Sequence, residues 1–473
     1  MTDNIESLLQ TAAQQRAALG DTYHDRVIEA IYTDAARIAD QVVSRHGQRA
    51  RLGFDQKLDR ALTHPVWGFV VMGVMFFAVF WITITGANIP SQLLGDFLLT
   101  TVYNALHSLA AALSAPAWLS GLLIDGIYMA TAWVIAVMLP PMAIFFPLFT
   151  LLEDFGYLPR VAFNLDRLFA KVGAHGKQSL SMMMGYGCNA AGVIATRIID
   201  SPRERLIAII TNNFSICNGR WPTLILIGTI FVASVFPPEI ASLIAALSVV
   251  TVAALGIVVT LLVSGFLSHT WLKGEASVYS LELPPYRPPQ IMRTLYTSVI
   301  DRTLIVLWRA VVMAAPAGAV IWLTSNIYIG DASIAGHMVN LLNPFGLLLG
   351  LNGVILVAYI VAIPANEIII PTILMLTLTL GQNIAGAQSG VMLELGDAQV
   401  YQVLTQVGGW TMLTGINLML FSLLHNPCST TIMTIYNETK NLKWTAVATL
   451  LPLLLAFIVT FSTATIARLL GLV

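Results

Sequence analysis

Cysteine, asparagine and glutamate residues gather at four places where long apolar runs of the chain are interrupted. All three cysteines of the chain lie at one of these breaks. Thiolate is a soft ligand that suits copper(I), zinc and iron, whereas carboxylate and amide groups add harder oxygen donors. The sequence therefore predicts a transition-metal site formed by Cys188, Asn189, Cys217, Asn218, Asn366, Glu367 and Cys428.

Each of these residues also has a structural interpretation. A single cysteine in an apolar segment is usually a small filler, and Glu367 is also placed to cap the tip of a hairpin. However, an ionisable residue in apolar sequence costs roughly 2.5–3.5 kcal/mol to insert and by default marks a pathway. We therefore favour a cation-binding role for Glu367 and for at least one of the cysteines.

Four further polar residues are candidates for a transport pathway: Glu153, Asp154, Arg220 and His425. For each of them the structural alternative stays open. Glu153 and Asp154 are placed to end a helix and to pair with Arg160. The Arg220 side chain is long enough to reach water or backbone carbonyl groups, and His425 is open to a purely structural role.

The composition places these breaks inside a membrane. Of 473 residues, 57% are hydrophobic and only 10% are charged, whereas a soluble domain carries about 25% charged residues. The formal net charge of −1 argues against nucleic acid as a partner. The three cysteines lie in apolar surroundings, which argues against a disulfide framework. We expect an integral membrane protein with several helical spans, without a cleavable signal in its polar first 60 residues.

The distribution of Lys and Arg predicts the topology. The first span is expected at about 66–85. The residues before it include Arg45, Arg49, Arg51, Lys57 and Arg60, whereas residues 86–121 contain no Lys or Arg. The positive-inside rule then places the N-terminus in the cytoplasm. Continued along the chain, this rule predicts five parts: a cytoplasmic helical segment (1–62), a first span with a periplasmic interfacial segment (63–121), a first repeat (122–268), a cytoplasmic linker (269–309) and a second repeat (310–473).

In residues 1–62, apolar residues recur at helical spacing from Val27 to Val42, and Thr22 with Asp25 resembles a capping box. We expect an amphipathic helix packed on a neighbour. The span at about 122–152 is expected to be interrupted at Pro140-Pro141, and the first span of the second repeat to cover about 310–329.

Each repeat contains a segment that enters and leaves the membrane on one side. These re-entrant hairpins are predicted at about 178–196 and 344–381, and each is followed by a broken span, at about 206–233 and 407–436. The hairpins have opposite orientations. The predicted fold is an all-α polytopic membrane protein with two inverted repeats, the organisation of secondary transporters. Irregular backbone at membrane depth is tolerated only where protein buries it or a cavity wets it.

No nucleotide-binding motif accompanies these elements. Residues 173–179 resemble a phosphate-binding loop, but Gln178 stands where Ser or Thr is required after Lys177. We expect a protein that is not an enzyme.

Several stretches together resemble the membrane part of the ferrous-iron transport protein B family. The likeness covers roughly residues 20–470 and is most specific between Glu153 and Arg220. The matching stretches are Leu62-Thr63-His64-Pro65, residues 152–163 (LEDFGYLPRVAF), residues 185–189 (GYGCN), residues 195–197 (ATR), residues 202–205 (PRER), Cys217-Asn218-Gly219-Arg220, Asn366-Glu367 and Pro427-Cys428.

The resemblance implies Fe(II) import across a bacterial cytoplasmic (inner) membrane through two gate repeats. Fe(II) would be the transported ion rather than a permanently bound cofactor. Family members usually begin with a GTP-binding domain, whereas this chain starts near the helical region that follows it. The expected partners are therefore the lipid bilayer, a separately encoded small GTPase, a small SH3-like accessory protein and further copies of the chain. Many relatives carry Lys where this chain has Asn366, which removes a positive charge beside Glu367.

Two other functions remain open at this point. Similar gate repeats occur in nucleoside transporters, and Asn212, Asn213, Asn218, Asn366 and Trp221 could bind a base and ribose. A membrane scaffold or sensor that transports nothing is the third hypothesis. The three cysteines favour the metal.

Overall fold

The structure is a computed structural model that describes residues 11, 23–42, 54–174, 176–274, 286, 290–381 and 397–471. In this part of the chain the backbone is almost wholly helical. Its one strand pair is antiparallel, between β1 (Tyr328–Ile329) and β2 (Ala332–Ser333). The all-α prediction is confirmed.

Two helices precede the membrane part: α2 (Tyr23–Val42) and α3 (Phe54–Leu62). The apolar stripe of α2 does not pack on a neighbour as expected, since Ile31 is 61% exposed and Val42 is 77% exposed. The amphipathic pattern thus predicted the helix but not its burial. Thr22, the expected cap, lies outside the described residues.

The first span is far longer than expected. A continuous helical run of 46 residues, Trp67–Ala112, contains α4 (Trp67–Gly95), the π-helical segment η1 (Asp96–Val102) and α5 (Tyr103–Ala112). At 1.5 Å per residue this is about 69 Å, against about 30 Å of hydrocarbon. The absence of Lys and Arg from residues 86–121 indicated on which side of the membrane they lie. It carried no information on where the helix ends, and the helix continues past residue 85.

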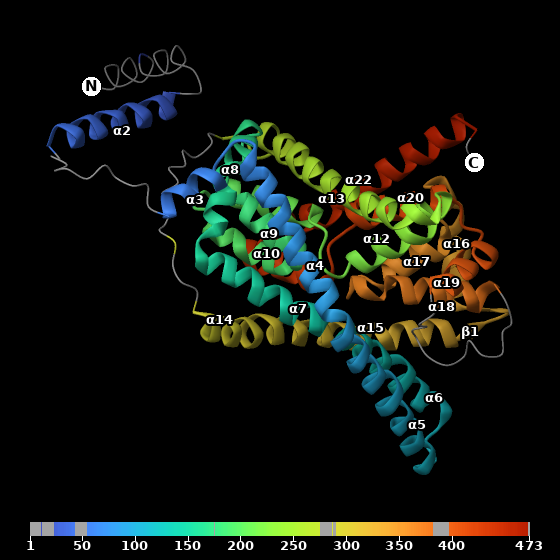
Figure 1. Cartoon of the computed structure of the whole chain (residues 1–473). Coiled ribbons are helices and arrows are strands. Elements are labelled where there is room, and N and C mark those ends of the chain that lie inside the picture. Colours follow the sequence, from blue (N-terminus) through green and yellow to red (C-terminus); the bar gives the residue numbers. More distant parts are fainter. Residues whose placement is uncertain are drawn as a thin grey trace, which may run out of the picture.

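The chain returns through α6 (Ala117–Ser120), the π-helical segment η2 (Gly121–Tyr128) and α7 (Met129–Phe155). α5 and α6 lie in an arm that projects from the body, whereas α7 lies within the body (Figure 1). Asp125 joins the two legs of the arm, because it accepts from Tyr103 Oη at 2.6 Å and lies 2.9 Å from His107 Nε2.

The expected interruption at Pro140-Pro141 is wrong. Both prolines, and Pro147, lie inside the α7 helix. In a membrane protein, neighbouring helices and local adjustments re-satisfy the backbone groups that a proline frees, so a proline pair need not break a span.

The rest of the first repeat contains the predicted hairpin and broken span. Its elements are α8 (Tyr157–Lys171), α9 (Gln178–Gly187), α10 (Asn189–Ala195), η3 (Thr196–Ile198), α11 (Pro202–Thr211), η4 (Asn212–Phe214), α12 (Trp221–Ile227), η5 (Gly228–Val232), η6 (Ala233–Val235) and α13 (Pro238–His269). The hairpin breaks at Cys188, and the broken span is non-helical from 215 to 220, so both predicted breaks are confirmed.

The second repeat follows a linker, of which residues 275–285 and 287–289 lie outside the described residues. Its elements are α14 (Ile291–Thr297), η7 (Ser298–Leu304), α15 (Ile305–Asn326), α16 (Ile334–Leu348), α17 (Gly353–Val361), η8 (Asn366–Ile368), α18 (Ile369–Gly381), α19 (Asp397–Gln402), η9 (Val403–Val407), α20 (Met412–Leu424), α21 (Ser429–Thr439) and α22 (Leu442–Leu469). Its first span begins at Ile291 instead of about 310, because the run Ile291–Asn326 is continuously helical.

Five helical runs of the described chain are long and apolar enough to cross a membrane. They are Trp67–Ala112, Ala117–Phe155, Glu239–His269, Ile291–Asn326 and Leu442–Leu469. Two further pairs of helical runs are long and apolar enough to cross a membrane when each pair is counted as one span. They are Ile334–Leu348 with Gly353–Val361 and Val400–Val407 with Met412–Thr439, and each pair is bent by 113° at the short break between its two runs. The chain is therefore a multi-pass membrane protein.

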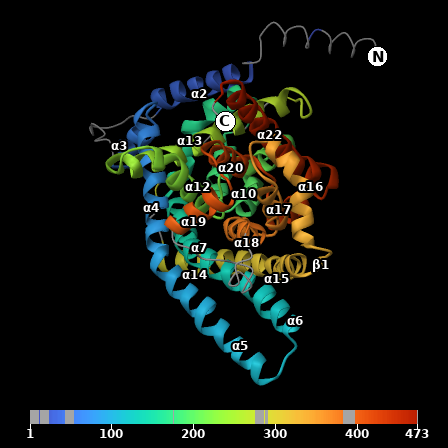
Figure 2. The ribbon, with the colours of Figure 1, turned by 90° about the vertical axis from the view of Figure 1, so that its right-hand side faces the viewer.

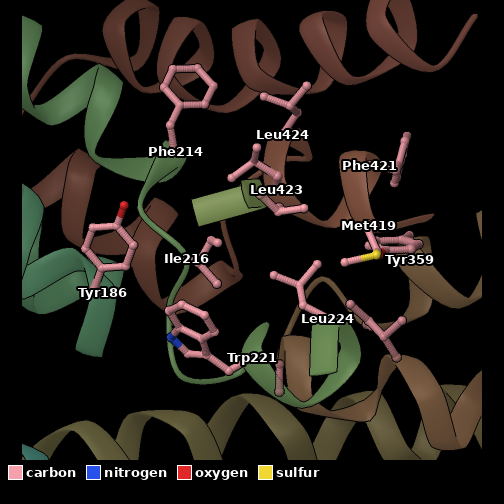
Figure 3. Packing of buried hydrophobic residues seen from close by; sticks show 14 of the residues in the cluster. Tyr186, Phe214, Ile216, Trp221, Leu224, Tyr359, Met419, Phe421, Leu423 and Leu424 are labelled. Carbon is pink, nitrogen blue, oxygen red and sulfur yellow. The ribbon is translucent and has the colours of Figure 1, made fainter. Parts of the chain in front are cut away.

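The hairpins and broken spans lie in the middle of the body, where Figure 2 places α10, α12, α17, α18 and α20. Buried side chains of the two repeats pack against each other there, among them Ile216 and Leu224 from the first and Leu423 and Phe421 from the second (Figure 3). This apolar core brings the four polar breaks together.

Candidate functional site

In each repeat, a backbone hydrogen bond joins the broken span to the hairpin. In the first repeat, the N–H of Asn218 in the broken span donates to the carbonyl of Gly187 at the hairpin tip, at 3.1 Å. In the second, the N–H of Ser429 donates to the carbonyl of Ile363, at 2.8 Å. Both donors directly follow a cysteine, Cys217 or Cys428, so these two cysteines occupy matching positions.

The two hairpin tips also have the same backbone conformation. Cys188 has φ −154° and ψ 122°, and Ala365 has φ −150° and ψ 117°. Each is followed by an asparagine, Asn189 or Asn366, at the start of a helical turn. These matches agree with a repeated unit, and superposition of the two repeats by a two-fold rotation stays a prediction.

Glycines at the first hairpin allow a close contact and do not unwind the backbone. Gly185 lies within α9 and Gly192 within α10. A Cβ atom at either position would lie 2.7 or 2.4 Å from Oδ1 of Asn212. The Asn212 side chain thus fits between the two helices and donates to the carbonyl of Asn189, at 2.8 Å. The break itself is confined to Cys188.

All seven residues predicted for the metal site line one cavity, which we call the junction cavity. Its volume is about 40 Å³. The seven are Cys188, Asn189, Cys217, Asn218, Asn366, Glu367 and Cys428. Cys217 is buried, the other two cysteines are partly buried, and all three thiols are free. The three cysteines thus line one cavity, but that their sulfur atoms come within coordination reach of one point, and that they act as ligands, stays a prediction.

The Glu367 carboxylate reaches across the junction cavity to the first repeat. A Cβ atom at Gly219 would lie 2.3 Å from its Oε1 atom. The carboxylate therefore occupies space that only glycine leaves open. Among the described residues no Lys, Arg or His forms an ion pair with Glu367. A half-buried carboxylate without a basic partner is suited to bind a cation.

A series of polar contacts runs from His425 through Asn366 to Cys217 on the other side of the cavity. His425 Nε2 lies 3.3 Å from Oδ1 of Asn366, and Asn366 Nδ2 lies 3.9 Å from the sulfur of Cys217. His425 Nδ1 lies 2.9 Å from the carbonyl of Ser422. His425 is only 2% exposed and does not line the cavity. It touches the candidate ligand Asn366, so it positions that amide and does not face the cavity itself.

Arg220 joins the two broken spans. Its Nη1 atom donates to the carbonyls of Asn213 and Leu423, at 2.9 and 3.1 Å. Its Nη2 atom donates to Oδ1 of Asn213 at 3.0 Å and to the carbonyls of His425 and Asn426, both at 3.3 Å. The guanidinium is 1% exposed and satisfies carbonyls that the break at His425 leaves without helical partners. The carbonyl-pairing interpretation of Arg220 is confirmed.

Glu153 and Asp154 lie at the exposed end of α7, and neither lines the junction cavity. Their expected partner Arg160 instead donates to Asp59 at 3.0 Å, and Asp154 accepts from Thr294 Oγ1 at 2.6 Å. Burial by itself would raise the pKa of Asp59, but hydrogen bonds from Arg160 and Tyr286 hold this pKa below its usual value. Through Asp59, Arg160 and Tyr286, these contacts hold α3 and the linker against α8.

The described residues hold no ready-made metal cluster, since no three His, Cys, Asp or Glu side chains are arranged to hold an ion. This is compatible with a transport site, where binding must stay weak enough for the ion to leave. The asparagine and backbone oxygens of the four breaks are additional donors of the harder kind.

Some residues of the cavity wall were not predicted. Met138 of α7 and Val306 and Ala310 of α15 close one side, and Thr430 and Thr431 lie beside Cys428. The Thr431 hydroxyl is 3.3 Å from the Cys428 sulfur. Gly219 could have been found from the sequence, because it lies between the candidate residues Asn218 and Arg220. Met138 is one of 17 methionines, and nothing in the sequence distinguishes it from the others.

Two family models match the chain. The model described as "Nucleoside recognition" (Gate) matches residues 135–231 and 307–442, and that of "Ferrous iron transport protein B C terminus" matches residues 249–302. The first covers both hairpins and both broken spans. No solved structure matches the chain significantly.

Curated relatives named "Fe(2+) transporter FeoB" are similar over most of the chain. The protein of Staphylococcus aureus (strain COL) is 28% identical over 98% of this chain, that of Synechocystis sp. 29% over 85%, and that of Helicobacter pylori 30% over 64%. The aligned parts make up 66%, 62% and 45% of these relatives. The chain thus spans less than two thirds of their length.

Proposed function

We propose that this chain, which belongs to the ferrous-iron transport protein B family and corresponds to its membrane part, conducts Fe(II) through the junction cavity. The observation that carries this proposal is the meeting of three thiols, one carboxylate and three amides in a single cavity at four helix breaks. Sulfur donors favour a transition metal over Mg²⁺ or Ca²⁺, and Glu367 supplies a negative charge.

The nucleoside alternative is less well supported. Of the residues that could bind a base and ribose, only Asn218 and Asn366 line the cavity. Asn213 is engaged with the carbonyl of His425 and with Arg220. No aromatic side chain of the described residues lines the cavity to stack on a base. The relatives' names also favour iron.

The topology and partners belong to the same proposal. We place the N-terminus in the cytoplasm of a bacterial cell and the chain in its inner membrane, on the strength of the positive-inside rule. Fe(II) is the substrate, and a separate small GTPase and a small SH3-like protein are the proposed partners, with self-association as a further possibility. Affinity capture from native membranes with the tagged chain tests these partners.

Uptake into proteoliposomes tests the function. Purified protein is reconstituted, and uptake of radioactive iron, kept ferrous by ascorbate, is compared with uptake of labelled uridine and with protein-free liposomes. We expect iron uptake above the protein-free background and no uridine uptake. Uridine uptake without iron uptake would favour the nucleoside alternative, and neither would favour a scaffold or sensor.

A further inference from the structure

Glu438, at the end of α21, binds two arginines of the first repeat. Arg197 donates to both carboxylate oxygens, with Nη2 at 2.6 Å from Oε1 and Nε at 3.0 Å from Oε2. Arg205 Nη2 donates to Oε2 at 2.7 Å. The Glu438 side chain is only 5% exposed. We call these three residues the clasp.

The clasp lies where the chain concentrates its basic residues. Arg197, Arg203 and Arg205 follow the first hairpin, and Lys440 and Lys443 follow α21. The contact between Arg197 and Glu438 places these two segments on one side of the protein, which we call the basic face. The positive-inside rule makes it the cytoplasmic face. No local sequence signal pairs residues 241 positions apart.

Two helices lead from the junction cavity to the clasp. Cys188 directly precedes α10 and Cys428 directly precedes α21, and both cysteines line the cavity. α10 and α21 pack against each other. Arg197 lies in η3, two residues beyond the far end of α10, and Glu438 lies in the last turn of α21. From Cys428 to Glu438 the distance along the helix is about 15 Å, at 1.5 Å per residue. The clasp thus joins the two repeats at the outer end of a helix pair that starts at the cavity.

We propose that the clasp is the cytoplasmic gate of the junction cavity: the ion leaves between α10 and α21 when Glu438 parts from Arg197 and Arg205. This inference rests on the proposed function for its direction. With Glu438 bound, the carboxylate pairs with both neighbouring arginines, offsets one of their two positive charges and holds the helix ends together. Without it, the two arginines repel each other and nothing in the clasp joins the repeats. The two states of the proposed gate are the clasp with Glu438 bound, as in the structure, and with Glu438 parted from the arginines.

The chain contains its own reporters for this gate. Its three cysteines all line the junction cavity, so the rate at which a membrane-impermeant thiol reagent labels them measures access to the cavity. Inside-out vesicles containing the full chain expose the basic face. In Glu438→Gln we expect labelling from this face about tenfold faster than in wild type, a size typical for loss of charge-assisted hydrogen bonds. Labelling from the opposite face should not change.

Lys177→Gln is the matched control. Lys177 forms an ion pair with Asp200 on the same face, at 2.9 Å, but within the first repeat. Its loss should leave cysteine labelling unchanged. Equal labelling rates in Glu438→Gln and wild type would overturn the gate, and so would acceleration from both faces together, which indicates loosened packing.

A second variant guards against misfolding of Glu438→Gln. Removing both arginines, Arg197→Gln with Arg205→Gln, opens the same contact from the other side. The triple variant should label no faster than either, because all three changes remove one interaction. Additive rates would refute a shared clasp. The labelling needs no iron, so it tests the gate even if wild-type protein takes up no Fe(II), in which case the proposed function alone fails.

Discussion

The two repeats contribute the same backbone but different chemistry to the junction cavity. Both hairpin tips have the same break followed by asparagine, and both broken spans place a cysteine beside it. The first repeat adds sulfur, from Cys188 and Met138, whereas the second repeat adds the carboxylate of Glu367. In place of Met138, the second repeat presents Val306 and Ala310 to the cavity.

This difference indicates how an inverted repeat becomes selective. Shared breaks create the cavity, because they free backbone groups and bring four segments to one place. The side chains of the two repeats then differ, so that sulfur atoms of the first repeat line one wall of the cavity and the second repeat contributes the negatively charged Glu367. A hard cation would be attracted by Glu367 alone, whereas a borderline cation such as Fe(II) would use both walls.

Loss of the charge in the second repeat should have the largest effect. We expect Glu367→Gln to lower Fe(II) uptake at least about a hundredfold, since even residues that only support a metal ligand cost 10–100-fold in affinity. Glutamine keeps the size and hydrogen-bonding capacity of glutamate, so a structural cap would survive the change. Uptake of radioactive iron into proteoliposomes measures this effect.

Glu239→Gln is the matched control, because Glu239 lies in the first turn of α13, away from the cavity. It should transport at the wild-type rate. Wild-type uptake by Glu367→Gln would make Glu367 a structural cap, and the cysteines would then be the principal candidates.

The second-largest effect should come from Gly219 of the first repeat, because it leaves the space that the Glu367 carboxylate occupies. In Gly219→Ala the new Cβ would lie 2.3 Å from Oε1 of Glu367, so the carboxylate must move. A displacement of about 1 Å in a functional group can cost as much as a hundredfold, and we expect about a thirtyfold loss of uptake. Gly73→Ala, where the structure leaves open space, is the control. Unchanged uptake would show that the position of the carboxylate is not critical.

The sequence predicted the breaks well because each one interrupts an apolar run with polar residues. It also predicted which residues meet, since irregular segments at membrane depth must share a cavity. It failed where the signal was ambiguous. Pro140 and Pro141 read as a break, but the surrounding helices preserve α7. For Arg220 the sequence left a pathway role and a carbonyl-pairing role open, and the structure shows the carbonyl pairing, with both repeats. Glu438 had no local signal, because its partners come from the other repeat.

The cysteines should rank third. Cys188 and Cys428 both occupy the position before a helix, where serine is the better cap. Cys188→Ser and Cys428→Ser should therefore keep the fold and lose only the soft donor. We expect each to lower Fe(II) uptake about tenfold while Mn(II) uptake changes much less. Competition between the two ions in proteoliposomes measures the ratio. An equal loss for both ions would mean that the thiols act through packing and not as ligands.

Met138 should have the smallest effect and should test the asymmetry of the cavity most finely. Its thioether lies on the wall that the first repeat supplies, opposite a carboxylate from the second, and a neutral thioether binds more weakly than a thiolate. Met138→Leu keeps the volume but removes the sulfur, so we expect about a threefold loss of Fe(II) uptake with a lowered preference for Fe(II) over Mn(II).

Met142→Leu is the matched control, because Met142 is 2% exposed on the same helix and does not line the cavity. If both leucine variants lower uptake of the two ions alike, Met138 is a packing residue and the soft wall consists of the cysteines alone. If only Met138→Leu shifts the preference, α7 takes part in selection although it lies outside both hairpins and both broken spans.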